Sequence, residues 1–226
     1  SKITFNVSAI NGTDIQVDWG NGELNDYKIA DYDGEGWVFS EIAGTIAGKT
    51  ITVYASDPAI INYLDLSKDL SDDADVYIIS ADFSLLKGVK KLYLGKNKLT
   101  SLDVSGMESL ATLDALDNQL TKLTLPQSEV LTSINVSNNV NITSGEKNED
   151  AGDNQVLGSK WSNVPNLTTL NVNGNSASKM GLFGSFDISS NKSLKTLNAN
   201  CCDLSSIDVT QNTALNTFNA QWNRFT

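Results

Sequence analysis

The feature that most constrains this chain is a short segment that occurs six times. Each copy follows L-x-x-L-x-L-x-x-N-x-L, with Asn or Cys at the ninth position. The copies begin at Val89, Leu110, Leu131, Leu167, Leu194 and Leu215. A single copy cannot bury its apolar side, so only stacked copies make a core. The pattern therefore predicts a coiled architecture for more than half of the chain, with function on the solvent side of a shared sheet.

The spacing of the copies indicates true repetition with two insertions. Successive starts lie 21, 21, 36, 27 and 21 residues apart, so one step is longer by 15 residues and another by 6. Insertions in a solenoid normally enter loops and leave the stacked strands unchanged. The longer insertion, residues 143–163, is polar and acidic before VLGSKW, a candidate helical turn. A flexible loop and a loop that contributes to specificity both fit this composition.

A second motif follows the first within each coil. LTSLDVS, LTKLTLP and LSSIDVT begin ten residues after their parent copies, and FGSFDIS begins 16 residues after its parent, at Phe183. So short a period leaves no room for a full crossover helix. We therefore expect a mainly β leucine-rich repeat solenoid of the α/β class, a right-handed curved coil. Its strands would line the concave side, with short extended or 3₁₀ segments on the convex side.

Alternation along each strand separates core from surface, because successive side chains point to opposite faces. The fourth and sixth positions are expected to be buried, from Leu92 and Leu94 in the first copy to Phe218 and Ala220 in the last. The outward positions are candidates for ligand binding on the concave face. They are Tyr93, Asp114, Asn135, Asn171, Asn198 and Asn219 at the fifth position, and Lys91, Thr112, Ser133, Thr169, Thr196 and Thr217 at the third. Alternatively, these side chains bond only to one another and to water.

The ninth positions form a second set, which we interpret as a structural ladder. They are Asn97, Asn118, Asn139, Asn175, Cys202 and Asn223. Amides there can satisfy backbone groups of the turn, whose loss of partners costs about 1–3 kcal/mol each. Cys202 would fill one place as a small buried polar group, and Cys201 would point outward as a free thiol. A vicinal disulfide or a metal site is the less favoured alternative.

The composition excludes several classes of function. A net charge of −11 argues against binding to nucleic acid or to anionic membranes. No apolar run approaches the roughly 18 residues of a membrane span. The chain has no histidine, which removes Ser-His-Asp and Cys-His catalysis and histidine metal sites. We therefore expect no enzyme activity and no cofactor.

Residues 1–58 lack the repeat and read as a β-rich cap. Strand candidates cover residues 3–9, 14–19, 37–42 and 50–55, with Asn-Gly turn dipeptides between them. Such a unit would cover the open edge of the first coil. Residues 59–88 read as irregular entry coils, so the solenoid is expected to span residues 59–226, with regular repeats over 89–226.

One acidic segment resembles the start of a calcium-binding loop. It contains Asp31, Asp33 and Glu35. An EF-hand needs its bidentate glutamate at the twelfth place, which is Ile42 here. An ordinary acidic turn is the favoured interpretation, and a weak calcium site is the alternative.

LTSLDVSGMESLATLDALDNQLTKLTL and LKTLNANCCDLSSIDVTQNTALNTFNAQWNRF resemble bacterial cell-surface leucine-rich repeat proteins with internalin-type repeats of 21 residues, over about residues 60–226. Their consensus is LTxLDVSxNTxLxxLxCxxNQL. This chain departs from the family's sixth-position cysteine ladder, since it has alanine at three of those positions. IQVDWGNG, at residues 15–22, is similar to a V-D-W-G-D-G strand–turn of β-sandwich modules in such secreted proteins.

The resemblance implies an exported protein at a bacterial cell surface, with a lipid anchor on a removed N-terminal segment as one option. The first hypothesis for function is a non-enzymatic module for protein recognition or adhesion, through the concave face and the insertion. The alternative is a glycan-binding accessory protein. Trp222 and Phe225 lie in the last coil, where self-association, further chain or a closing turn would cover them.

Overall fold

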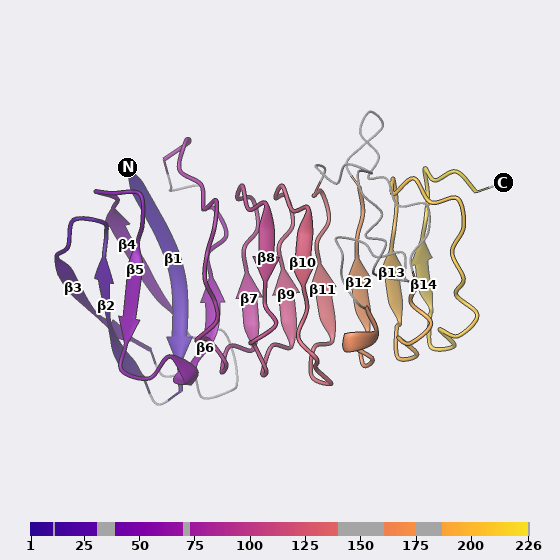
Figure 1. Cartoon of the computed structure of the whole chain (residues 1–226), viewed down its shortest axis with the longest axis horizontal. Coiled ribbons are helices and arrows are strands. Elements are labelled where there is room, and N and C mark those ends of the chain that lie inside the picture. Colours follow the sequence, from indigo (N-terminus) through magenta and orange to yellow (C-terminus); the bar gives the residue numbers. More distant parts are fainter. Residues whose placement is uncertain (11, 31–38, 70–72, 140–160, 175–186, 226) are drawn as a thin grey trace.

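The computed structural model describes residues 1–10, 12–30, 39–69, 73–139, 161–174 and 187–225. Strands dominate this part of the chain, with two 3₁₀ helices at Pro58–Ile60 (η1) and Trp161–Asn163 (η3). The strands form a nine-stranded sheet, a three-stranded sheet and a two-stranded sheet (Figure 1). η3 begins at Trp161, the last residue of VLGSKW, and the rest of that candidate helical turn lies outside the described residues.

Each copy of the repeat contributes one strand to the large sheet. These strands are β7 (Lys91–Tyr93), β9 (Thr112–Asp114), β11 (Ser133–Asn135), β12 (Thr169–Asn171), β13 (Thr196–Asn198) and β14 (Thr217–Asn219). They run parallel, and the same repeat position pairs from strand to strand, as Leu92 with Leu113 and Leu113 with Ile134. The result is a mainly β, solenoid-like fold whose coils follow one another along the long axis of the molecule (Figure 1).

The large sheet continues into the N-terminal segment without a break. Strand β6 (Ile61–Asp65) lies parallel to β7. Strand β1 (Lys2–Ala9) is antiparallel to β6 on one side and to β4 (Ser40–Thr45) on the other. The sheet therefore crosses the boundary expected near residue 58. Its strands are parallel from β14 to β6, and β1 is the first antiparallel strand.

A second, antiparallel sheet covers the inner side of β1 and β4 (Figure 1). It consists of β3 (Leu24–Ile29), β2 (Thr13–Asp18) and β5 (Thr52–Ala55). Trp19 is 5% exposed, and its ring lies 6.3 Å from that of Phe5 and 6.3 Å from that of Tyr27, to whose hydroxyl its indole N–H donates at 3.2 Å. The sequence predicts strands close to the other four, but it does not predict β3.

The D-W-G-N-G segment makes the turn between β2 and β3. One carboxylate oxygen of Asp18 accepts hydrogen bonds from the backbone N–H groups of Gly20, Asn21 and Gly22, at 2.7, 3.0 and 2.9 Å. Gly20 and Gly22 have φ of 99° and 80°, a region that side chains disfavour. The hydrogen bonds from the Gly20 and Gly22 N–H groups lower the pKa of Asp18. The turn therefore uses an aspartate to accept the three bonds and glycines at the two positions of positive φ.

On the second side of the coils, β8 (Ser101–Asp103) and β10 (Lys122–Thr124) form a parallel pair. They carry the second motif, which confirms the expected extended segments in these two coils. Asp103 accepts a hydrogen bond from the N–H of Ser105, two residues later, at 2.9 Å. The same D-x-S/T turn recurs at Asp187 and Asp208. Hydrogen bonds from the Ser or Thr lower the pKa of each of these aspartates.

The inward repeat positions form the core in every copy except the last, in which Ala220 is only half-buried. Leu92, Leu113 and Leu197 are at most 1% exposed, and burial of each such side chain contributes roughly 1.5–3 kcal/mol. Phe218 was expected to be equally buried, but it is 41% exposed. The reason is that β14 pairs with β13 alone, so no strand covers its other side within the described residues.

Candidate binding face

The third and fifth positions of the repeats share one surface of the large sheet, which we call the ladder face. Strand register places Thr169 beside Thr196 and Asn171 beside Asn198, and the other copies align in the same way. All twelve sequence-predicted ligand-binding residues therefore lie in two adjacent rows. Neighbouring strands are about 4.8 Å apart, so an extended peptide or sugar chain lying across the strands could contact side chains of several coils in each row.

The ladder face extends further than the sequence predicts. Tyr63 pairs with Lys91 and Asp65 pairs with Tyr93, so β6 adds a rung to both rows. Asn6 of β1 lies opposite Asp65 and also opposite Glu41 of β4, which carries the fifth-position row across the N-terminal strands. The available signal was Tyr-Leu-Asp at 63–65, which imitates the third to fifth positions of a repeat.

The fifth-position side chains are largely engaged within the protein. Asp114 accepts a hydrogen bond from the N–H of Leu116 at 3.0 Å, and Asn135 accepts one from Ser137 at 3.2 Å. The Asn135 amide also donates to Asp114 at 2.9 Å, and that of Asn219 donates to Asn198 at 2.7 Å. These side chains therefore close the turn after each strand and link neighbouring coils.

The third-position threonines differ, because their hydroxyls are available. Thr112, Thr169 and Thr196 are half-buried. Their hydroxyls make no side-chain hydrogen bond within the described ranges. Thr217 is the exception in this row, since its hydroxyl donates to Asn216 at 3.1 Å. A ligand on the ladder face would therefore meet the threonine hydroxyls as its main unsatisfied polar groups.

An aromatic stack lies at the N-terminal end of the ladder face, and we call Phe39, Tyr63 and Tyr93 the aromatic ledge. The rings of Phe39 and Tyr63 are 5.8 Å apart and nearly parallel, at 10°, and those of Tyr63 and Tyr93 are 5.6 Å apart at 45°. Phe39 is 41% exposed, whereas Tyr63 is 8% exposed. Ser8, which pairs with Tyr63 in the neighbouring strand, is fully buried.

The electrostatic environment of the ledge is negative. The Tyr63 hydroxyl donates to Asp65 at 3.5 Å. Burial raises the pKa of Tyr63, and the negative charge of Asp65 raises it further. Burial also raises the pKa of Tyr93, with smaller contributions from Asp114 and Asp65. Both hydroxyls therefore stay protonated at neutral pH.

The ninth-position asparagines bind the backbone of their own coil and of the preceding one. The amide of Asn118 donates to the carbonyls of Leu94 and Ala115 at 2.9 and 3.2 Å, and its oxygen accepts from the N–H of Leu99 at 3.0 Å. Corresponding bonds occur at Asn97, Asn139 and Asn223. Asn175 lies outside the described residues.

Cys202 occupies one place in this ladder. Its thiol is fully buried and lies 3.0 Å from the carbonyl of Val172 and 3.3 Å from that of Asn200. Burial raises the pKa of this thiol to about 12. Cys201 is half-buried, and both cysteines are free thiols. The vicinal disulfide is therefore not formed.

A second asparagine ladder was not predicted. Asn191 and Asn212 lie three residues before Leu194 and Leu215, and both are buried. The amide of Asn191 donates to the Val164 carbonyl at 2.9 Å, and that of Asn212 donates to the Asn191 carbonyl at 2.9 Å. Their equal offset from the repeat start was the signal that could have identified them.

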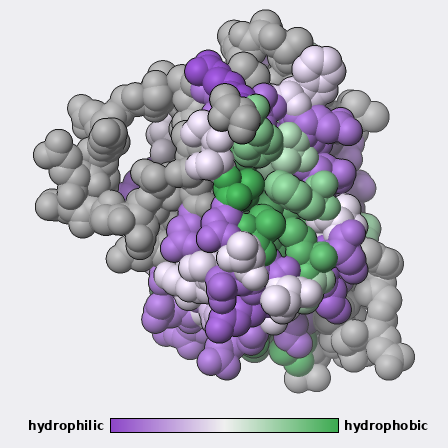
Figure 2. Space-filling view, turned by 90° about the vertical axis from the view of Figure 1, so that its right-hand side faces the viewer, coloured by the Kyte–Doolittle hydropathy of each residue, from purple (hydrophilic) through white to green (hydrophobic). Residues whose placement is uncertain are grey.

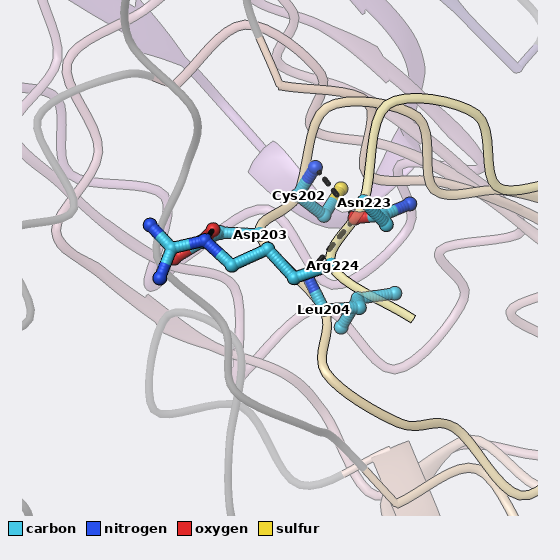
Figure 3. A network of polar contacts seen from close by, with 5 residues as sticks. All are labelled: Cys202, Asp203, Leu204, Asn223 and Arg224. Atoms are coloured by element: carbon cyan, nitrogen blue, oxygen red, sulfur yellow. Dashed lines mark hydrogen bonds and ion pairs between the residues drawn. The ribbon is translucent and has the colours of Figure 1, made fainter. Parts of the chain in front are cut away.

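The last coil combines a polar anchor with an apolar surface. Arg224 forms an ion pair with Asp203, which is 7% exposed (Figure 3). The N–H of Arg224 donates to the Leu204 carbonyl at 2.8 Å. Figure 2, which views this end directly, shows apolar side chains in the middle with polar ones around them. Trp222 and Phe225 are 75% and 45% exposed.

Other kinds of site find no support in the described part of the chain. No group of three or more Cys, Asp or Glu side chains there could hold a metal ion. Asp31, Asp33 and Glu35, and residues 143–160 of the insertion, lie outside it. No helix within the described ranges has the length and apolar character to cross a bilayer. Comparison with known protein families and with curated proteins finds no match to this chain.

Proposed function

We propose that the chain is a leucine-rich repeat solenoid of the bacterial cell-surface kind, and that it is a non-enzymatic extracellular module that recognises a protein through the ladder face. The observation that carries the proposal is the pairing of equivalent residues along β6, β7, β9, β11, β12, β13 and β14. Two rows of outward side chains on rigid strands form a preorganised surface, which lowers the entropic cost of binding.

The aromatic ledge favours a protein partner. Tyrosine is one of the residues enriched at the hot spots of protein interfaces, and Phe39 and Tyr93 lie at one end of the ladder face. The threonine hydroxyls next to the ledge favour a second candidate, a glycan ligand, since sugars pack on aromatic rings and bond to hydroxyls. The insertion at 143–163 is an additional specificity element in either proposal.

The third-position threonines provide the sharpest test. Substituting Thr112, Thr169 and Thr196 together by Lys places three charges on the ladder face without removing a side-chain hydrogen bond. The matched control adds the same charges at Ser101, Thr213 and Ala214, which are exposed outside the large sheet. Both variants would be compared with the unsubstituted chain on an array of extracellular-matrix and plasma proteins and on a glycan array.

Under the proposal, the ladder variant loses at least about tenfold in affinity for the bound protein, while the control keeps it. Unchanged binding by the ladder variant would place recognition elsewhere, in the insertion or the N-terminal sheets. Binding confined to the glycan array, and lost in the ladder variant, would select the second candidate.

Self-association through the last coil is a separate proposal. The exposed Phe218, Trp222 and Phe225 support it, because contiguous apolar surface commonly marks an interaction site. Sedimentation velocity would detect the dimer. A monomer at the highest attainable concentration would dispose of this proposal without affecting the ladder face.

A further inference from the structure

Three carboxylates surround the aromatic ledge on the ladder face. Glu41 and Asp65 lie on either side of Asn6 in the fifth-position row, and Asp114 follows Tyr93 in the same row. The cation in the adjoining part of the third-position row is Lys91, which pairs with Tyr63. The ledge therefore combines exposed aromatic surface with an excess of negative charge.

The hydrogen bonds of these carboxylates favour a cation over a sugar. Both oxygens of Asp114 accept from neutral donors, the Leu116 N–H and the Asn135 amide. One oxygen of Asp65 accepts from the Ser67 N–H at 2.9 Å. A sugar hydroxyl needs an acceptor oxygen that is not already occupied by another donor. A cation is attracted by the negative charge of the carboxylate, which hydrogen bonds from neutral donors do not remove.

The geometry of the stack selects between the two cationic side chains. Phe39 lies nearly parallel to Tyr63 and is 41% exposed. A planar guanidinium can extend such a stack and still bond to neighbouring carboxylates, but a lysine ammonium cannot stack. The raised pKa of Tyr93, to which Asp114 and Asp65 contribute, is independent support for a negative potential at this place.

We infer that the aromatic ledge receives an arginine side chain of the protein partner, stacked on Phe39 and held by Glu41 and Asp65. This inference rests on the proposed function, because it names the chemistry that the ladder face would recognise. The net charge of −11 also favours encounter with a basic partner.

The test is an NMR titration of the full ¹⁵N-labelled chain at low salt. The probe is the peptide acetyl-Gly-Ser-Arg-Ser-Gly-amide, and its matched control has citrulline, a neutral isostere, in place of arginine. The expected result is saturable shifts at the amides of Tyr63, Asp65 and Tyr93, with at least about tenfold weaker binding of the citrulline peptide.

Two variants test the groups that carry the inference. Glu41→Gln with Asp65→Asn removes both charges, and the Asn oxygen can still accept from the Ser67 N–H, so the turn is kept. Phe39→Ala removes the exposed ring. Each should weaken binding of the arginine peptide about tenfold, whereas Thr213→Ala, at an exposed residue outside the large sheet, should leave its affinity unchanged.

Equal shifts with arginine and citrulline, no shifts with either, or full affinity in the charge-removed variant would each overturn the inference. Shifts confined to the threonine end would also overturn it while leaving the proposed function intact. The proposed function would be contradicted by a different result, unchanged partner binding in the variant with lysine at Thr112, Thr169 and Thr196. That variant does not alter the aromatic ledge.

Discussion

The sulfur of Cys202 lies 3.0 Å from the carbonyl oxygen of Val172, in the preceding copy of the repeat. Asn118 makes the equivalent contact to Leu94, and Asn139 to Ala115. In each case the acceptor is the sixth-position carbonyl of the coil before. A thiol therefore replaces an amide as the group that ties one coil to the next.

Reagents should distinguish the two thiols of the native protein. Cys202 is fully buried and its pKa is raised to about 12, whereas Cys201 is half-buried. Because the thiolate is the reactive form, we expect an aromatic disulfide reagent at pH 8 to modify one thiol in the folded chain and the second after unfolding. Rapid modification of both thiols in the native state would contradict the burial of Cys202.

The same thiol should make stability fall at alkaline pH. Its ordinary pKa is 9.0, so between pH 9 and about 12 the unfolded chain loses this proton while the folded chain keeps it. The contribution is fully present below pH 9 and is lost as the pH rises. Between pH 8 and pH 10.5, the free energy of unfolding in urea should therefore decrease less for Cys202→Ser than for the unsubstituted protein. Because Tyr63 and Tyr93 also have raised pKa values, the free energy of unfolding should still decrease somewhat in both the variant and the unsubstituted protein.

Asn139→Ala should destabilise the fold by about 2–4 kcal/mol. The substitution leaves the Leu120 N–H and the Ala115 carbonyl without their partner in a buried turn. Urea unfolding followed by circular dichroism measures this change. Thr169→Ala is the control, because its hydroxyl makes no described side-chain bond, and it should change stability by less than about 0.5 kcal/mol. Similar values for the two variants would exclude a structural role of the ladder.

Gly44→Ala should disrupt the packing of the two N-terminal sheets. A Cβ at this position would lie 2.2 Å from the Trp19 ring, which is buried. Overpacking of this kind costs about 1–3 kcal/mol or more, and thermal unfolding would report it. Gly106→Ala is the matched control, since its Cβ would meet its nearest neighbour, a Ser84 oxygen, at an ordinary 3.5 Å. An unchanged melting temperature for Gly44→Ala would show that Trp19 can move aside.

The ion pair of Asp203 and Arg224 should show coupling in a double-mutant cycle. Arg224→Ala leaves a carboxylate whose side chain is 8% exposed without its cation, and we expect a loss of about 1–2 kcal/mol, moderated by the exposure of the arginine. Adding Asp203→Asn to Arg224→Ala should restore part of that loss, because it removes the uncompensated charge. Strictly additive effects in urea unfolding would mean that the pair contributes nothing.

The regular repeats explain why much of the ladder face was predictable. Alternation in L-x-x-L-x-L assigns Asn171 and Thr169 to the surface and Leu170 to the core, and each strand then copies its neighbour. The ends of the array were less predictable. Tyr63 and Asp65 belong to the rows, but their segment lacks the flanking repeat signature. Phe218 matches the inward pattern and is nevertheless exposed, since burial depends on a neighbour that sequence periodicity does not show.

The N-terminal sheets illustrate a second limit. Strand β3 reads L-N-D-Y-K-I and is mostly exposed, so it lacks the apolar alternation of a half-buried strand. Phe39 and Tyr63 stack although 24 positions separate them in sequence. Their contact depends on β1 lying between β4 and β6, and such long-range order leaves no local trace in the chain.

The position of β1 between β4 and β6 affects the order in which this protein can fold during synthesis. Residues 2–9 leave the ribosome before either neighbouring strand, at residues 40–45 and 61–65, has been made. Each later coil needs only the coil made immediately before it. Strand β1 therefore stays unpaired until β4 and β6 are made, and its pairing with them supplies the edge on which the later coils assemble in sequence.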